Sequence, residues 1–157
     1  MIVVADTSPL NYLVLIGEIQ LLPTLYERVL IPEEVHRELQ RLQTPPSVQA
    51  WAAKLPSWCE VRVVTSTADP ALSELDPGER DAIQLALDAR IDTVLMDEMS
   101  GRREALRRHL RVTGTVAVLE KAANRGLIDF RDALQRLEST NFRLSPAIRD
   151  AFLKRNP

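Results

Sequence analysis

Hydrophobic residues fall into two patterns along the chain: short continuous runs, and positions three or four residues apart. Short β-branched runs are typical of buried strands, and the wider spacing is typical of helices. The runs predict strands at residues 2–5, 28–31, 61–64, 93–96 and 111–113. The helical spacing predicts helices at residues 10–16, 19–26, 32–42, 48–55, 76–87, 100–110, 115–124 and 130–137, and one more within 142–157. The polar stretch 65–75 is predicted to be a loop.

The ends of three helices carry recognisable signals. Thr7 and Ser8 are candidate caps of the first helix, and Pro9 stands near its first position. The helix that opens at Pro32 has its apolar stripe at Val35, Leu39 and Leu42. Ser100 can cap an arginine-rich helix whose apolar face is Ala105, Leu106 and Leu110.

Strands that alternate with helices at this spacing predict an α/β protein. The expected architecture is a three-layer α/β/α sandwich with a central, mainly parallel sheet. The 157 residues suit one domain, and no linker divides them. We therefore expect a single domain over residues 1–157, with 127–157 as a C-terminal helical extension.

Composition excludes several kinds of site. The single cysteine, Cys59, excludes an intramolecular disulfide framework and a cysteine-based zinc cluster, and the two histidines are far apart in sequence. No apolar run approaches the roughly 20 residues of a membrane-spanning helix. We expect a soluble, cytoplasmic protein without membrane association. A hard-metal site made of carboxylates stays open.

Two predicted strands end at an aspartate, Asp6 after residues 2–5 and Asp97 after 93–96. Ligands of open parallel sheets bind beyond the carboxyl ends of the strands. Each aspartate alone is as well explained as a helix cap or loop residue. Two at the same sheet edge favour a shared divalent cation, because close like charges otherwise repel.

Two glutamates can join this pair. Glu38 precedes the stripe residue Leu39 and can border the buried face, although a solvated helix glutamate explains it as well. Glu79 follows Asp76 by three positions, a spacing that also fits a capping box. A glutamate in the first turn of a helix can still direct its carboxylate into a crevice.

Four segments in order resemble the acidic motifs of PIN-domain ribonucleases, in particular VapC-like toxins. They are Val-Ala-Asp-Thr-Ser-Pro-Leu at 4–10, Ile-Pro-Glu-Glu-Val-His-Arg-Glu-Leu at 31–39, Gly-Glu-Arg-Asp-Ala-Ile-Gln-Leu-Ala at 78–86, and Val-Leu-Met-Asp-Glu at 94–98. The resemblance places the second acid at Glu38. It places the third at Glu79, with Asp81 as the alternative because many relatives have aspartate there. The Asp-Thr-Ser-Pro-Leu opening, the Gly-Glu pair and Val-Thr-Gly-Thr at 112–115 resemble one particular subgroup.

The resemblance implies a metal-dependent ribonuclease that hydrolyses RNA phosphodiester bonds. Carboxylates without nearby histidine or thiol suit Mg²⁺ or Mn²⁺. Asp6, Glu79 and Asp97 are the expected metal ligands, and Glu38 is expected to act through water or a second ion. The resemblance also implies the toxin of a type II toxin–antitoxin pair, which forms a homodimer and is inhibited by an antitoxin protein.

Substrate contacts are expected close to these acids. Five arginines lie between residues 102 and 111, and guanidinium groups bind phosphate in bidentate fashion. Arg102 and Arg103 stand nearest the expected site, although a solvated charged face explains the run equally well. Ser8 and Asn11 are further candidate substrate contacts. Core packing is favoured over base stacking for Tyr12, Trp51 and Trp58.

Two alternatives stay open. A non-catalytic PIN-fold protein that binds nucleic acid or a partner would show the same fold without binding Mg²⁺ or Mn²⁺. A nuclease acting on DNA also stays open, because a phosphodiester site of this kind does not specify the sugar.

Overall fold

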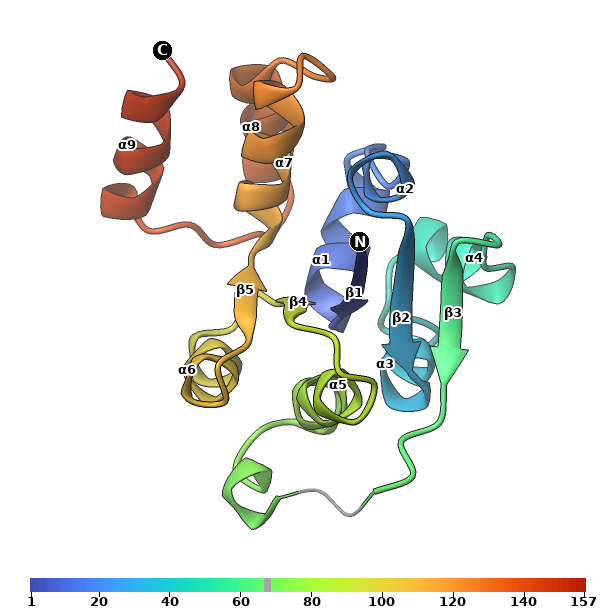
Figure 1. Cartoon of the computed structure of the whole chain (residues 1–157). Helices are drawn as coiled ribbons and strands as arrows, with labels where there is room; N and C mark the ends of the chain where they lie inside the picture. The colour runs from blue at the N-terminus through green and yellow to red at the C-terminus, as the bar shows by residue number, and fades with distance from the viewer. Residues whose placement is uncertain (67–68) are drawn as a thin grey trace.

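The computed structural model describes residues 1–66 and 69–157 and has a five-stranded sheet at its centre (Figure 1). All strand pairs are parallel, and the strand order is β3-β2-β1-β4-β5. The strands are β1 (Ile2–Ala5), β2 (Arg28–Pro32), β3 (Cys59–Arg62), β4 (Thr93–Leu95) and β5 (Arg111–Thr113).

Helices connect the strands and continue after the last one. They are α1 (Thr7–Leu15), α2 (Leu21–Leu25), α3 (Glu33–Glu38), α4 (Pro46–Ala53), α5 (Pro77–Asp88), α6 (Met99–Arg107), α7 (Thr115–Asn124), α8 (Phe130–Glu138) and α9 (Pro146–Arg155). Over residues 1–66 and 69–157, none of them combines the length and the apolar character needed to cross a membrane.

Alternate residues of each strand face two separate cores. Val3 and Ala5 of β1 pack in one core with apolar residues of α1, α3, α4, α7 and α8. Val4, between them, packs in the other core with residues of α5 and α6. This alternation follows from the two-residue period of a strand. Helices therefore cover both faces of the sheet, which confirms the predicted α/β/α sandwich with a parallel sheet.

The strand order reverses between β1 and β4. The chain runs from β1 outward to β2 and β3, and then crosses back through α5 to place β4 on the other side of β1. Helices that leave two neighbouring strands in opposite directions open a crevice at their carboxyl ends. The backbone amide of Asp6 donates to Leu95 O at 2.9 Å, which fixes Asp6 at this crevice.

Several predicted element bounds were wrong. The strand expected at 61–64 is Cys59–Arg62, because its register pairs Cys59 with Val29, and Val63 is exposed. The first helix after Pro32 ends at Glu38, so Leu42 lies outside it and is 95% exposed. Of the predicted stripe, Val35 within the helix and Leu39 at its C-cap are buried.

Smaller corrections concern caps and loops. The N-cap of α6 is Glu98 rather than Ser100, and Leu106 is exposed whereas Ala105 and Leu110 are buried. The loop predicted at 65–75 contains a 3₁₀ turn at Pro70–Leu72, whose Leu72 is buried, while its residues 67 and 68 lie outside the described residues. α4 begins at Pro46 rather than at residue 48 because a proline is favoured in the first turn.

Candidate functional site

Asp6 is one of two buried carboxylates of the crevice. It follows β1 directly and is 4% exposed. It stands at the N-cap position of α1, but its side chain makes no capping hydrogen bond. Among the described residues, its Oδ1 is a buried oxygen without a hydrogen-bond partner. The capping explanation of Asp6 therefore fails, and its carboxylate is left available to another ligand.

The surroundings of Asp6 disfavour its negative charge. Desolvation by burial raises its pKa well above the usual range, and the nearby carboxylates of Asp76, Glu79 and Glu38 raise it further. The adjacent backbone amide of Thr7 acts in the opposite direction. We call Asp6, Glu38, Asp76 and Glu79 the acidic centre, because each of the other three perturbs the pKa of Asp6.

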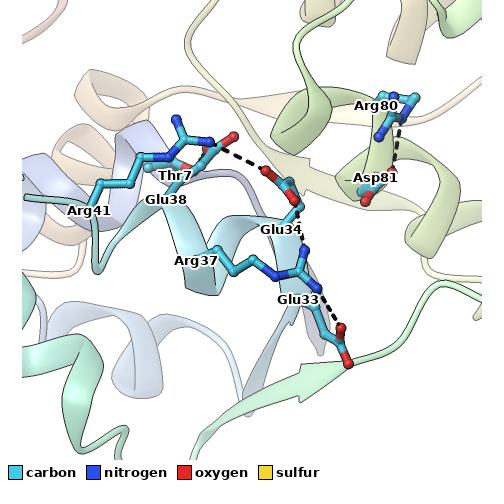
Figure 2. A network of polar contacts seen from close by, with 8 residues as sticks. All are labelled: Thr7, Glu33, Glu34, Arg37, Glu38, Arg41, Arg80 and Asp81. Atoms are coloured by element: carbon cyan, nitrogen blue, oxygen red, sulfur yellow. Dashed lines mark hydrogen bonds and ion pairs between the residues drawn. The ribbon is translucent and has the colours of Figure 1, made fainter.

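Glu79 reaches this centre from the first turn of α5. It is 3% exposed, and burial together with the charges of Asp76 and Glu98 raises its pKa from the usual 4.5 to about 7. Asp81, the alternative third acid, instead forms an ion pair with Arg80 at 3.1 Å (Figure 2). Of the two candidates for the third acid, Glu79 is therefore the one that lies near the other acids.

Glu38 approaches from the end of α3. Its Oε2 accepts a hydrogen bond from the Thr7 hydroxyl, and both side chains are drawn together in Figure 2. Burial raises the pKa of Glu38, the Thr7 hydroxyl lowers it, and Asp76 raises it. A Cβ at Gly78 would lie 2.6 and 2.7 Å from the two Glu38 carboxylate oxygens. Glycine at 78 therefore leaves the space that Glu38 fills.

Asp97 is held by hydrogen bonds. β4 ends at Leu95 rather than at the predicted residue 96, so Asp97 lies two residues beyond the strand. Its Oδ2 accepts from the Ser8 and Thr115 hydroxyls, each at 2.7 Å, and its Oδ1 accepts from the Thr115 backbone amide at 2.7 Å. Thr7 and Ser8 thus use their hydroxyls to hold Glu38 and Asp97 rather than to cap α1. The first turn of α1 links the acidic centre to Asp97.

Arg102 points from α6 toward Asp97. Its Nη1 donates to Met96 O at 3.1 Å. A Cβ at Gly114 would lie 2.9 Å from this Nη1 and 3.0 Å from Asp97 Oδ1, so the missing side chain of Gly114 makes room for both groups. Arg103, the next residue of α6, is exposed.

Hollows lie on both sides of the first turn of α1. One has a volume of about 570 Å³, and Ser8, Asp97 and Arg102 belong to its lining. The other has a volume of about 600 Å³, and Thr7, Asn11 and Glu38 belong to its lining. Each predicted substrate contact except Arg103 therefore lines a hollow beside a predicted acid.

The donor set of the acidic centre fits a hard cation. Its members are oxygen donors, three of them have raised pKa values, and Asp6 carries a buried oxygen without a partner. Within residues 1–66 and 69–157, however, no three His, Cys, Asp or Glu side chains lie close enough together to hold one ion. Coordination of one cation by three of these side chains at once would therefore require them to move closer to one another, whereas one or two carboxylates with waters can hold Mg²⁺.

Sequence reasoning missed two contributors to this site. Asp76 was considered as a cap, and its Oδ1 does accept from the Glu79 amide at 3.0 Å, but its charge also raises the pKa of three other acids. Thr115, which holds Asp97 twice, lies within the Val-Thr-Gly-Thr segment and was not assigned a role. The resemblance of this segment, residues 112–115, to one PIN subgroup was the sequence signal that pointed to Thr115.

Comparison with known proteins identifies the family of the chain. No curated protein matches the sequence significantly. A family model described as PIN domain matches residues 2–156, and this range contains all five strands and all the acids discussed above. Because the match covers nearly the whole chain, the protein belongs to the PIN-domain family.

Proposed function

We propose that the protein is a Mg²⁺- or Mn²⁺-dependent endoribonuclease. PIN domains are generally nucleases, and those nucleases typically use divalent metal ions. The observation that carries the proposal is the Asp6 carboxylate, buried with an unpartnered oxygen among Glu38, Asp76 and Glu79 at the carboxyl ends of β1 and β4. Such a cluster is costly without a positive charge and is relieved by one.

The proposed cation ligands and substrate contacts lie on two sides of α1. Asp6 and Glu79 supply the buried carboxylates that would hold a cation, and Glu38, fixed by Thr7, completes that side. Asp97 is the further expected ligand, and Ser8 and Thr115 fix its orientation. Arg102 is placed to contact a phosphate near Asp97. When bound, the cation stabilises negative charge on the phosphoryl oxygens and acidifies the attacking water.

The biological role proposed here is that of a type II toxin with an antitoxin partner, acting as a homodimer in the cytoplasm. The sequence resemblance to VapC-like toxins supports this role. RNA is the proposed substrate on the same basis.

Cleavage of a mixed RNA pool tests the enzymatic proposal. Wild type, Asp6→Asn and Asp97→Asn are compared with Mn²⁺, with Mg²⁺ and with EDTA, and DNA of the same sequences is run in parallel. We expect metal-dependent cleavage of RNA by wild type and its loss in both variants, with circular dichroism showing intact folds. Equal activity in all three proteins contradicts the proposal. Cleavage of DNA but not of RNA would indicate a deoxyribonuclease instead.

A metal titration separates the enzyme from a non-catalytic PIN-fold protein. We expect wild type to bind Mn²⁺ at millimolar concentration or below, and Asp6→Asn to bind it much more weakly. The exposed variant Asp129→Asn, at the N-cap of α8, is the control for loss of one negative charge. Absence of binding by wild type would favour the non-catalytic alternative.

A further inference from the structure

The 570 Å³ hollow extends well beyond Asp97. It begins at Ser8 and Asp97 and continues between α1, α6 and the C-terminal residues 141–152. Its volume lies within the roughly 300–1,000 Å³ of small-molecule sites in proteins. The C-terminal extension therefore forms one wall of a groove that opens onto the candidate site. We call it the C-terminal groove.

Aromatic side chains line the middle of the C-terminal groove. Tyr12 of α1 and Phe142 lie edge to face, with ring centroids 4.9 Å apart and planes at 85°. The Tyr12 hydroxyl donates to Asn141 Oδ1 at 2.8 Å, which ties the extension to α1. Phe142 is half-buried, so part of its surface remains accessible in the groove. These rings are fixed in place without being enclosed in the core.

Cationic side chains lie on two walls of the same groove. Arg102 comes from α6, beside Asp97, and the exposed Arg143 comes from the extension. Guanidinium groups bind phosphate, and aromatic side chains stack on unpaired bases. α9, which is described in full, buries none of its residues, and the lining residue Ile148 is 45% exposed. The extension thus keeps apolar surface available rather than sealing it.

We propose that the C-terminal groove is a nucleotide subsite for single-stranded RNA. Phe142 contacts the base of an unpaired nucleotide that flanks the phosphate attacked at Asp97, and Arg143 contacts the backbone of that nucleotide. The inference rests on the proposed ribonuclease function. It assigns the C-terminal extension a direct role in substrate binding and makes a paired duplex a poor ligand, because aromatic side chains stack on unpaired bases.

Binding measured without metal tests the subsite independently of cleavage. Fluorescent eight-nucleotide single-stranded RNA is titrated in EDTA into wild type, Phe142→Leu, Phe142→Trp, Arg143→Ala and the control Arg131→Ala, an exposed arginine of α8 away from the groove. We expect Phe142→Leu to weaken binding about tenfold, and Phe142→Trp to retain it. Arg143→Ala is expected to reduce the salt slope of log Kd by about 0.7, as for one lost phosphate contact, and Arg131→Ala to leave it unchanged. Thermal melts check that each variant folds.

Cleavage of RNAs with single abasic positions locates the subsite. We expect one position next to the cleaved bond at which removal of the base slows cleavage by wild type. Removal of the same base should not slow cleavage by Phe142→Leu any further. Two results together would contradict the subsite proposal but not the ribonuclease proposal. They are cleavage by wild type that is equally sensitive to base removal at every position, and unchanged RNA binding by Phe142→Leu. Wild type that neither binds nor cleaves RNA overturns both.

Discussion

Asp6 and Asp97 lie beyond the carboxyl ends of two neighbouring strands, β1 and β4, but have opposite surroundings. Each follows a buried strand next to the point where strand order reverses. Asp6 is buried with one oxygen unpartnered, and nearby acids raise its pKa. Asp97 is half-buried, and both of its oxygens accept hydrogen bonds at 2.7 Å. The same local motif, a strand followed by aspartate, thus produces one strained carboxylate and one satisfied carboxylate.

The difference indicates two kinds of contribution to a single site. A desolvated carboxylate among like charges raises the free energy of the cation-free protein and favours binding of positive charge. A carboxylate fixed by three hydrogen bonds has its direction set before any ligand arrives, and such orientation supports ligand geometry. In the proposed nuclease, the Asp6 side would therefore attract a cation, and the Asp97 side would supply a carboxylate of fixed orientation.

Replacing each aspartate by asparagine has the largest expected effect and separates the two contributions. We expect both variants to lose about 10²–10³-fold in RNA cleavage, because several kcal/mol of charge stabilisation depend on the site. Their stabilities should diverge. Asp6→Asn removes a repelled charge and raises the melting temperature in EDTA, whereas Asp97→Asn leaves hydrogen-bond donors unmatched and lowers stability by about 1–3 kcal/mol.

Denaturant unfolding in EDTA measures this divergence, and the exposed Asp129→Asn serves as the charge control. Equal destabilisation by Asp6→Asn and Asp97→Asn would show that the two carboxylates have the same structural role. The contrast between them would then have no energetic basis.

Thr115→Val tests the Asp97 side without touching a carboxylate. Valine keeps the shape of threonine but removes the hydroxyl that donates to Asp97 Oδ2. Loss of a group that orients a ligand typically costs about 10–100-fold, and we expect a reduction of that size in kcat. Thr24→Val, at an exposed position of α2, is the matched control. Unchanged kcat would mean that Ser8 and the Thr115 amide suffice to orient Asp97.

The pH dependence of stability tests the Asp6 side. A raised carboxyl pKa means that the folded, cation-free protein binds its proton more tightly than the unfolded chain does, so ionisation destabilises the fold. For Glu79 the pKa rises from 4.5 to about 7, and the free energy of unfolding should fall as pH increases through this window. We expect a fall of about 1–2 kcal/mol between pH 5 and 8 in EDTA.

Glu79→Gln should remove much of this slope, whereas the exposed control Glu74→Gln should retain it. Mn²⁺ is expected to raise the melting temperature of wild type more at pH 8 than at pH 5. Stability of wild type that increases with pH over this window would contradict the assignment of strain to the acidic centre.

Most of the fold could be predicted from the sequence because its elements are short and strongly patterned. β5 at Arg111–Thr113 and α7 at Thr115–Asn124 have the predicted bounds. The errors arose where tertiary pairing decides an end. β3 begins at Cys59 because its partner β2 sets the register, and Leu42 is exposed because the chain leaves the helix at Glu38, where Thr44 donates to the Glu38 carbonyl.

The candidate site could be predicted less completely. Residues that follow a strand are visible in a single sequence, so Asp6 and Asp97 could be predicted by position. Contacts between distant segments are not visible, such as the Thr115 hydroxyl on Asp97 or the space that Gly78 leaves for Glu38. The groove beside Phe142 depends on how the extension packs on α1, which no local pattern encodes.

Substitution of the α6 arginines has the smallest expected effect. It tests whether RNA contacts only the Asp97 side of α1. Arg102 lies beside Asp97 with Nη1 bonded to Met96 O, whereas Arg103 is exposed. A side chain that holds substrate phosphate without contacting the reacting atoms raises KM and leaves kcat largely unchanged. We expect Arg102→Ala to raise KM for RNA by roughly fivefold and Arg103→Ala by less than about twofold, since exposed phosphate contacts are screened by salt. Equal increases in KM would mean that RNA follows the whole basic face of α6. In that case the two sides of α1 would still differ in the surroundings of their carboxylates. The RNA, however, would contact more of the protein than the Asp97 side.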